Sequence, residues 1–158
     1  MDANARPKRC GLIAAILLSL VLLVGAVSLP QPASSSPVPR HLLAYRYATW
    51  QQGKWYCWGG TGPSCYDCSG LVVSAYRYAG IYLPRTTYGM LSDPQLIQIP
   101  RWETRWGDLA FYGSGHVELV GPWGGTIGAH SSGERISWVP YSAWWHPTMY
   151  FRVAGAGG

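Results

Sequence analysis

The sequence predicts an α+β domain in which helices pack on one side of an antiparallel β-sheet. Two helix-like segments occupy the first half of the folded region, whereas apolar residues recur with a period of two after Gly107. Short glycine-containing turns separate these later segments, as between neighbouring antiparallel strands. Because the helices come first and the strands follow without further helices between them, the order favours separate layers over a parallel βαβ fold.

A basic head and an apolar stretch precede the folded region. Three basic residues between positions 6 and 9 are followed by an uncharged segment from Gly11 to Leu29. Residues 1–29 are therefore predicted to be an export signal or a membrane anchor. We favour an uncleaved anchor, because neither AVS at 26–28 nor PAS at 32–34 is a clean small-x-small cleavage site. The basic flank stays inside, so the rest of the chain is expected outside the cytoplasmic membrane, secreted or anchored to its outer face.

A linker separates this segment from the domain. Residues 30–40, PQPASSSPVPR, are rich in Pro and Ser and have no apolar period, which is typical of an extended, solvated linker. We predict a folded domain over residues 41–153 and a flexible tail over residues 154–158.

The charge of the predicted domain excludes one class of partner. Four of the 12 Lys and Arg residues precede the domain, which leaves eight basic against six acidic residues and a net charge of +2. No cluster or stripe of Lys and Arg remains, so nucleic acid is not an expected partner. We expect a monomer.

The helices are predicted from apolar spacing and from residues that begin and end helices. His41–Gly53 has apolar residues near helical spacing and a final glycine. A loop rich in Gly and Pro follows, and a second helix begins near Cys68, with Asp67 as its N-cap and Gly80 as its stop. One apolar face of this helix is expected to pack on the core: Leu71, Val72, Ala75 and Ala79. Residues 81–90 are expected to be irregular.

Five strands are predicted after Gly107 from alternating apolar residues. Turns such as GSG, PWGG and SSGE separate several of them. Their expected ranges are Leu109–Tyr112, His116–Val120, Thr126–Ala129, Ile136–Val139 and Tyr150–Val153.

The three cysteines of the domain allow several functions. An odd number in an exported domain leaves one thiol unpaired. A redox pair of Cys65 and Cys68 is disfavoured, because a Gly-rich loop rather than a strand precedes it. Structural zinc at Cys57, Cys65 and Cys68 is disfavoured, because such sites show two paired sets of ligands. A nucleophile is favoured, since the start of a helix stabilises the thiolate of Cys68 and its N–H groups can bind an oxyanion.

A cysteine nucleophile also needs an imidazole from elsewhere in the fold. His116 begins a predicted strand and His130 ends the next one, so adjacent strands can bring both rings beside the helix start. His41 and His146 have no such setting, and we expect them to be ordinary core or surface residues.

Three segments together resemble the NlpC family of bacterial cell-wall cysteine peptidases. They are YCWGG, then YDCSGLVVSAYRYAGIYLPRTT, then GDLAFYGSGHVELVG, and the similarity spans about Tyr45 to Val139. D-C-S-G alone is a weak signal, but with L-P-R-T and G-D-L…H-V in order it is specific. The resemblance implies a minimal papain-like fold, in which the nucleophile helix packs against an antiparallel sheet that carries the histidine.

The resemblance also implies roles for individual residues. Cys68 matches the nucleophile and His116 the general base. Tyr56 matches a loop tyrosine whose hydroxyl lies near the nucleophile and helps to hold the oxyanion. Asp67 and Ser69 match residues that flank the cysteine and shape the site.

The sequence departs from the family pattern at the residue that orients the imidazole. Gly128 stands where that residue usually lies, and His130 follows two positions later on the same strand face. Glu118 lies two positions after His116 and is an alternative orienting residue, or an edge carboxylate in water. Trp106 stands where proline commonly precedes G-D-L, which we expect to affect only the turn.

With Cys68 matched to the nucleophile, the resemblance leaves Cys57 and Cys65 as the candidate disulfide, in keeping with an oxidising exterior. A bridge between Cys65 and Cys68 is the alternative, and it would block the nucleophile until it was reduced.

The function implied by the resemblance is hydrolysis of peptide bonds in peptidoglycan stem peptides through an acyl-enzyme, without a metal or other cofactor. Peptidoglycan peptide is the expected partner, together with the membrane if the N-terminal segment is uncleaved. The alternatives are a catalytically degenerate wall-binding or scaffolding domain, and an amidase or acyltransferase on the same fold.

Overall fold

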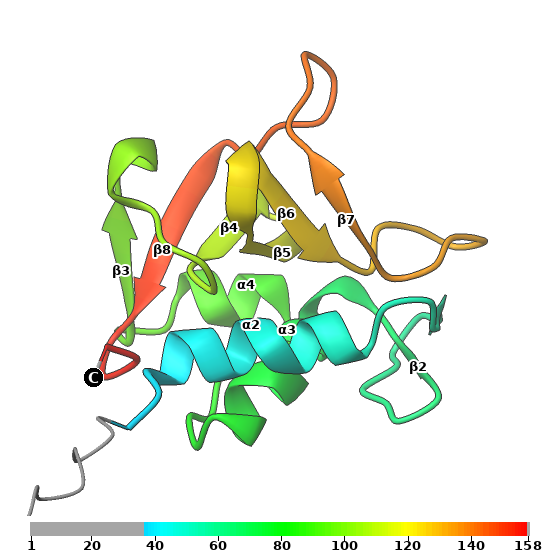
Figure 1. Cartoon of the computed structure of the whole chain (residues 1–158), viewed down its shortest axis with the longest axis horizontal. Helices are drawn as coiled ribbons and strands as arrows, with labels where there is room; N and C mark the ends of the chain where they lie inside the picture. The colour runs from blue at the N-terminus through cyan, green and yellow to red at the C-terminus, as the bar shows by residue number, and fades with distance from the viewer. Residues whose placement is uncertain (1–36, 158) are drawn as a thin grey trace, which may run out of the picture. The chain divides into compact units, whose positions relative to one another are not determined.

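Helices lie along one side of a six-stranded antiparallel sheet in the computed structural model, which describes residues 37–157 (Figure 1). The helices are α2 (Arg40–Trp50), α3 (Cys68–Tyr78) and the short α4 (Thr87–Leu91). Helix α2 packs against α3, and α3 packs against strand β5 (His116–Val120). The predicted α+β arrangement, with the Cys68 helix on an antiparallel sheet, is confirmed.

The sheet has the order β3-β8-β4-β5-β6-β7, and every pairing in it is antiparallel. Its other strands are β3 (Leu96–Ile99), β4 (Leu109–Tyr112), β6 (Gly125–Gly128), β7 (Ser137–Pro140) and β8 (Met149–Val153). All five predicted strands are present with ends shifted by at most one residue, a normal uncertainty in such boundaries. Strand β3 was not predicted.

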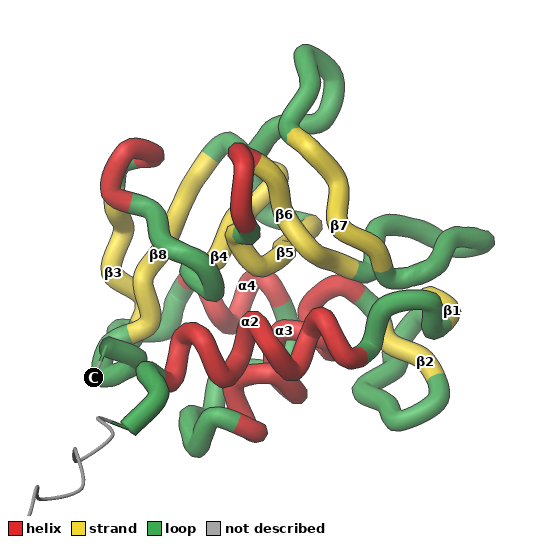
Figure 2. The backbone as a smooth tube through the Cα atoms, in the orientation of Figure 1, coloured by secondary structure: helices red, strands yellow, loops and turns green. Residues whose placement is uncertain are grey.

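The smaller elements lie in the connections. Strands β1 (Trp55–Tyr56) and β2 (Cys65–Tyr66) form a short parallel pair in the loop before α3 (Figure 2). Two 3₁₀ turns, η2 (Arg101–Glu103) and η3 (Pro122–Gly124), follow β3 and β5. The expectation that residues 81–90 are irregular is wrong for α4, which Thr86 begins by accepting a hydrogen bond from the Gly89 amide at 3.1 Å.

The core lies between α3 and the sheet. The predicted face of α3 is buried, but the burial extends almost around the helix, from Ser69 to Tyr76, because α2 covers one side and the sheet another. The sheet contributes side chains that are fully buried: Leu109, Phe111, Val117, Leu119 and Ile127. Removal of this apolar surface from water supplies the main stabilisation, at about 25 cal/mol per Å².

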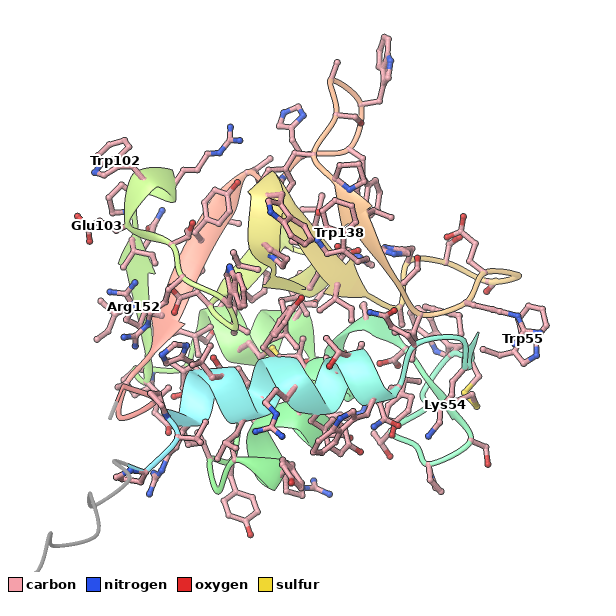
Figure 3. The ribbon with its side chains drawn as sticks, in the orientation of Figure 1. Lys54, Trp55, Trp102, Glu103, Trp138 and Arg152 are labelled. Carbon is pink, nitrogen blue, oxygen red and sulfur yellow. A yellow bond between two sulfur atoms is a disulfide. The ribbon has the colours of Figure 1, made fainter. Side chains whose placement is uncertain are left out.

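The turn before β4 explains the G-D-L sequence. Gly107 has φ +91°, and a Cβ there would lie 2.1 Å from the backbone oxygen of His41. The Tyr76 hydroxyl donates to the Gly107 carbonyl at 2.7 Å. Asp108 is fully buried and pairs with Arg152 at 2.9 Å. Arg152 also donates to the Glu103 carbonyl at 2.6 Å, so it ties β8 to this turn and to η2 (Figure 3).

His41 and the C-terminal residues belong to the core of the domain. The His41 ring is buried and hydrogen-bonded through Nδ1 to the Trp106 carbonyl at 2.7 Å, and burial lowers the pKa of this histidine. The His41 amide donates to the carbonyl of Ala156 at 3.0 Å, and Ala156 is 1 % exposed. The prediction of a flexible tail is therefore wrong at residues 154–156, which hydrogen bonds to Gln95 and His41 hold in place.

The predicted signal or anchor and most of the predicted linker lie outside the described residues. Arg40, predicted to be the last linker residue, is the first residue of α2. Within residues 37–157, no helix has both the length and the apolar character needed to cross a membrane.

We expect Gly107→Ala to destabilise the domain far more than Gly80→Ala. Both glycines have positive φ, +91° and +79°, but a Cβ at Gly80 meets nothing within 4 Å. Left-handed backbone alone costs about 1–2 kcal/mol, whereas collision with the His41 backbone adds roughly 2–3 kcal/mol. Urea unfolding of the two variants measures the difference, and equal losses of unfolding free energy would show that the close approach at Gly107 does not matter.

Candidate active site

Cys68 is the first residue of α3, and Asp67 begins this helix. The Asp67 backbone is extended, with φ −94° and ψ 178°, and its Oδ1 accepts a hydrogen bond from the Gly70 amide at 2.6 Å. This N-cap satisfies an amide that the helix itself leaves without a partner. The Cys68 thiol is free and partly exposed at the positive end of an 11-residue helix, an environment that stabilises a thiolate.

The loop before α3 lies against the first turn of that helix. Cys57 and Cys65 are joined by a disulfide with an S–S distance of 2.01 Å, so neither is free to bind metal or to pair with Cys68. A Cβ on Gly70 would lie 1.9 Å from the Gly60 carbonyl oxygen, and one on Gly60 would lie 2.3 Å from the Cys57 sulfur. Glycine at both positions therefore allows the loop to approach the helix start.

Arg85 ties this region to the chain before α4. It donates to Asp67 Oδ2 at 2.6 Å and to the Ser69 hydroxyl at 2.8 Å. The Gly59 amide donates to the same Asp67 oxygen at 2.8 Å. Asp67 and Ser69, expected to shape the site, thus lie on either side of Cys68 in one hydrogen-bonded group. Sequence reasoning assigned no role to Arg85, although the L-P-R-T segment that contains it was the available signal.

The sheet brings three ionisable side chains together beside the helix start. His116 begins β5, and its Nε2 donates to Glu118 Oε1 at 2.8 Å. His130 Nδ1 donates to the same oxygen at 2.5 Å. Glu118 is 0 % exposed, and its Oε2 accepts from the Tyr112 hydroxyl at 3.2 Å. The far nitrogen of His130 lies 3.2 Å from both the carbonyl and the hydroxyl oxygen of Ser137.

Glu118, rather than His130, therefore lies next to the His116 ring, and His130 lies on the other side of the carboxylate. The backbone explains why. A Cβ on Gly128 would lie 2.4 Å from Glu118 Cγ, so a side chain at 128 and the Glu118 side chain compete for one space. The glycine at 128 leaves that space to the glutamate. The alternative of an edge carboxylate in water is wrong, because Glu118 is completely buried.

The ionisation of Cys68 and His116 is coupled. Burial raises the pKa of the Cys68 thiol, but the hydrogen bond and charge of His116 lower it below its ordinary value, helped by backbone hydrogen bonds from Val117 and Ser69. Burial lowers the pKa of His116, but hydrogen bonds to Cys68 and Glu118 raise it to about 9. Since Nε2 of His116 faces Glu118, the nitrogen that faces the sulfur is Nδ1.

Glu118 remains charged for the same reason. Burial alone raises the pKa of this carboxyl group, but the hydrogen bonds and charges of His116 and His130 lower it to about 2. Burial lowers the pKa of His130, and Glu118 more than compensates, so the net shift is upward. The arrangement favours a thiolate, an imidazolium and a carboxylate in sequence from Cys68 to Glu118.

Two pockets flank these residues. One of about 450 Å³ contains Cys68, and its lining includes Tyr56, Asp67, Ser69, Arg85 and Tyr88. Burial raises the pKa of Tyr56, and the nearby charge of Cys68 raises it further. The Tyr56 hydroxyl thus remains protonated and able to donate at neutral pH.

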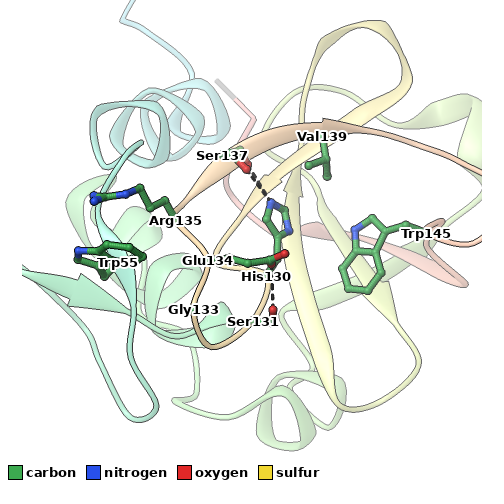
Figure 4. A pocket seen from close by; sticks show the side chains of 9 residues that line it. All are labelled: Trp55, His130, Ser131, Gly133, Glu134, Arg135, Ser137, Val139 and Trp145. Carbon is green, nitrogen blue, oxygen red and sulfur yellow. Dashed lines mark hydrogen bonds between the residues drawn. The ribbon is translucent and has the colours of Figure 1, made fainter.

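The second pocket, of about 680 Å³, lies on the His130 side (Figure 4). Trp55 and Arg135 line one end of it, with the guanidinium 3.7 Å from the ring centroid, and Trp145 lines the other. The Trp145 ring centroid lies 5.3 Å from that of His116. The sequence did not predict this contact, because Trp145 comes from an irregular loop with no periodic signal. His146, beside it in the chain, is exposed and outside the site, as expected.

The sequence model of the NlpC/P60 family matches residues 53–152. A probable endopeptidase p60 of Listeria monocytogenes is 38 % identical over 96 residues, which cover 58 % of this chain and 19 % of that protein. The murein DD-endopeptidase MepH of Escherichia coli is 42 % identical over 76 residues, 45 % of this chain and 28 % of that protein. The chain thus spans about a fifth of the length of the p60 relative.

Solved structures agree with the sequence matches. The peptidoglycan hydrolase RipB of Mycobacterium tuberculosis superposes with a TM-score of 0.64 at 25 % identity, over 89 % of this chain and 78 % of that one. NlpC1 of Trichomonas vaginalis superposes with a TM-score of 0.65 at 25 % identity, over 75 % and 45 % of the two chains.

We expect Cys68 to react with iodoacetamide at lower pH than an ordinary thiol does, because His116 lowers its pKa. In Glu118→Gln the His116 ring loses the charge that raises its pKa, so the imidazolium stabilises the thiolate less and the pKa of Cys68 rises. The pH profile of the alkylation rate should therefore move to higher pH in the variant. Peptide mass spectrometry locates the label, and superimposable profiles would contradict the coupling of Glu118 to Cys68.

Proposed function

The chain belongs to the NlpC/P60 family, and on that premise we propose that its domain is a cysteine endopeptidase that hydrolyses peptide bonds in peptidoglycan stem peptides. One observation carries the proposal. A free thiol at a helix start has its pKa lowered by the His116 imidazole, and a buried carboxylate accepts a hydrogen bond from that imidazole at 2.8 Å. A nucleophile, a base and an orienting group in contact are the requirements for acyl transfer.

In the first half of the reaction, the Cys68 thiolate attacks the carbonyl carbon of the scissile bond. The resulting oxyanion is stabilised by backbone N–H groups at the start of α3 and by the Tyr56 hydroxyl, which lines the same pocket. His116 then gives its Nδ1 proton to the leaving nitrogen. The C–N bond breaks, the amine leaves, and a thioester to Cys68 remains.

In the second half, water replaces the amine. His116, now neutral at Nδ1, takes a proton from the water as its oxygen attacks the thioester carbonyl. The C–S bond breaks and the carboxylic acid product leaves. The sulfur departs as the thiolate, and His116 is again the imidazolium.

Glu118 acts through His116 as a positioning residue. It fixes the ring with Nε2 towards the carboxylate and Nδ1 towards the sulfur, and its charge stabilises the imidazolium. This contact supports catalysis over the scaffold alternative, whose support was the missing orienting residue at position 128. The amidase and acyltransferase alternatives differ only in the bond attacked or in the acceptor, so reaction products distinguish them.

We place the enzyme outside the cytoplasmic membrane, where peptidoglycan lies. The support is the basic and apolar sequence of residues 1–29 and the cell-wall polymer named for the RipB and MepH relatives. If residues 1–29 remain as an anchor, the linker of residues 30–39 spans at most about 35 Å, which keeps the domain near the membrane face of the wall.

Cys68→Ala should abolish cleavage of purified peptidoglycan, with a loss of roughly 10⁴-fold or more, because it removes the thiol that forms the acyl-enzyme. Mass spectrometry of the released fragments identifies the cleaved bond. His146→Ala, in the exposed loop, is the matched control and should keep full activity. Release of the same fragments by Cys68→Ala as by the parent enzyme would contradict the mechanism. Products joined to a new amine would indicate an acyltransferase.

The side chains at positions 118 and 128 would occupy the same space, which allows a second test of the positioning role of Glu118. We expect Glu118→Ala to lower kcat by roughly 100-fold or more, with little change in KM, because the imidazole loses its orienting partner. Adding Gly128→His to Glu118→Ala places an imidazole in the vacated space and should restore about 10-fold of that loss. Gly128→His alone should be inactive, since its Cβ collides with Glu118. A folded double variant no more active than Glu118→Ala would contradict the positioning role.

A further inference from the structure

The side chains of His116, Glu118 and His130 offer donor atoms that all lie within 4.8 Å of one another. Both imidazoles converge on a single carboxylate oxygen, at 2.8 Å and 2.5 Å. Ligands of a tetrahedral zinc ion, each about 2.0–2.2 Å from the metal, lie about 3.4 Å apart. A small outward movement of the rings would therefore make room for an ion between the three donors.

We propose that these three residues bind one Zn²⁺ ion, and that this binding reversibly inhibits the enzyme. The inhibitory half of the inference rests on the peptidase function proposed above. The binding half does not, because it depends only on the donors and their surroundings.

The surroundings already hold each ligand in the orientation that a metal requires. Metal-binding imidazoles usually donate their other ring N–H to an oxygen, and metal-binding carboxylates are themselves hydrogen-bonded. Here the far nitrogen of His130 lies 3.2 Å from the Ser137 carbonyl, and Glu118 Oε2 accepts from Tyr112. The far nitrogen of His116 faces Cys68. No ligand would need a new supporting partner when the ion binds.

Zn²⁺ can replace the protons on the two histidines without leaving an excess of charge in the protein interior. Where both rings are protonated, each loses to solvent the N–H proton that it donates to Glu118, and two protons replaced by one Zn²⁺ leave the net charge unchanged. Two nitrogens and one carboxylate favour zinc over Mg²⁺ and Ca²⁺, which prefer oxygen ligands. The ion and a water as fourth ligand can enter from the pocket of about 680 Å³ that His130 lines (Figure 4).

Binding would stop the reaction through the tautomer of His116. A neutral ring that binds zinc through Nε2 carries its remaining proton on Nδ1, which is the nitrogen that must accept a proton from water during deacylation. The ring would also be drawn away from its hydrogen bond to Glu118, since the ion takes that place.

Calorimetric titration of the full chain with ZnCl₂, without substrate, tests the binding. We expect one ion per chain, and an affinity lowered roughly 100-fold or more in His130→Ala. His146→Ala should bind as the parent does, and Cys68→Ala should still bind one ion with an affinity lowered by about 10-fold, because it removes only the group that faces the far nitrogen of His116. Unchanged affinity in a folded His130→Ala would overturn the site, and so would loss of binding in Cys68→Ala, which would place the ion on the thiolate and His116.

Two further measurements complete the test. Co²⁺ bound in place of Zn²⁺ should give visible d–d absorption without a thiolate-to-metal charge-transfer band, and such a band would contradict the ligand set. Peptidoglycan cleavage should stop on addition of Zn²⁺ and return with EDTA. Binding with full cleavage would overturn the inhibition. A chain that binds zinc but cleaves nothing even after EDTA would count against the peptidase function and leave the metal site standing.

Discussion

The buried carboxylate of Glu118 is the constraint on which the site depends. An ionised carboxylate without partners in a protein interior costs several kcal/mol, and Glu118 is fully buried. Two imidazoles on one oxygen and the Tyr112 hydroxyl on the other offset that cost. These partners come from β4, from the start of β5 and from the chain after β6. The sheet must therefore be assembled before the carboxylate is satisfied, so correct strand pairing and a correctly placed His116 are one requirement.

The thiol side of the site depends on a different kind of contact. Glycine at positions 60 and 70 lets the disulfide-closed loop lie on the first turn of α3, and Arg85 joins Asp67 to Ser69 around the cysteine. The two halves meet because β5 packs on α3. The same strand supplies the imidazole and, one residue later, the backbone of Val117, and both lower the pKa of the thiol. A shift of β5 along the helix would break both contacts at once, so the reactivity of Cys68 reports on this packing.

Sequence periodicity predicted the fold class, the start of α3 and five strands, because each depends on local signals that packing did not override. It missed β3 and α4, which have four and five residues and are too short to show a period. Whether the Glu118 side chain is buried beside His116 or exposed to water was left open for a different reason. Alternation along β5 places residue 118 on the face of His116, but only tertiary structure decides whether that face meets water. Tyr112, Thr126 and the loop carrying Trp145 cover it, and no pattern in the chain foretells that cover.

A carboxylate beside the imidazole has two opposing effects on the proposed chemistry. It stabilises the imidazolium and so the thiolate, which speeds attack on the substrate carbonyl. It also makes the imidazolium a weaker acid, with a pKa near 9, which slows proton transfer to the leaving amine. His130 moderates this conflict, because it donates to the same oxygen and takes up part of the negative charge that His116 would otherwise feel alone. The second histidine therefore has a physical reason to be present, although it contacts Glu118 and not the imidazole of His116. Its effect on the reaction passes through Glu118. The far nitrogen of His130 lies near Ser137, and both residues line the neighbouring pocket, so a molecule bound there would alter the interaction of His130 with Glu118.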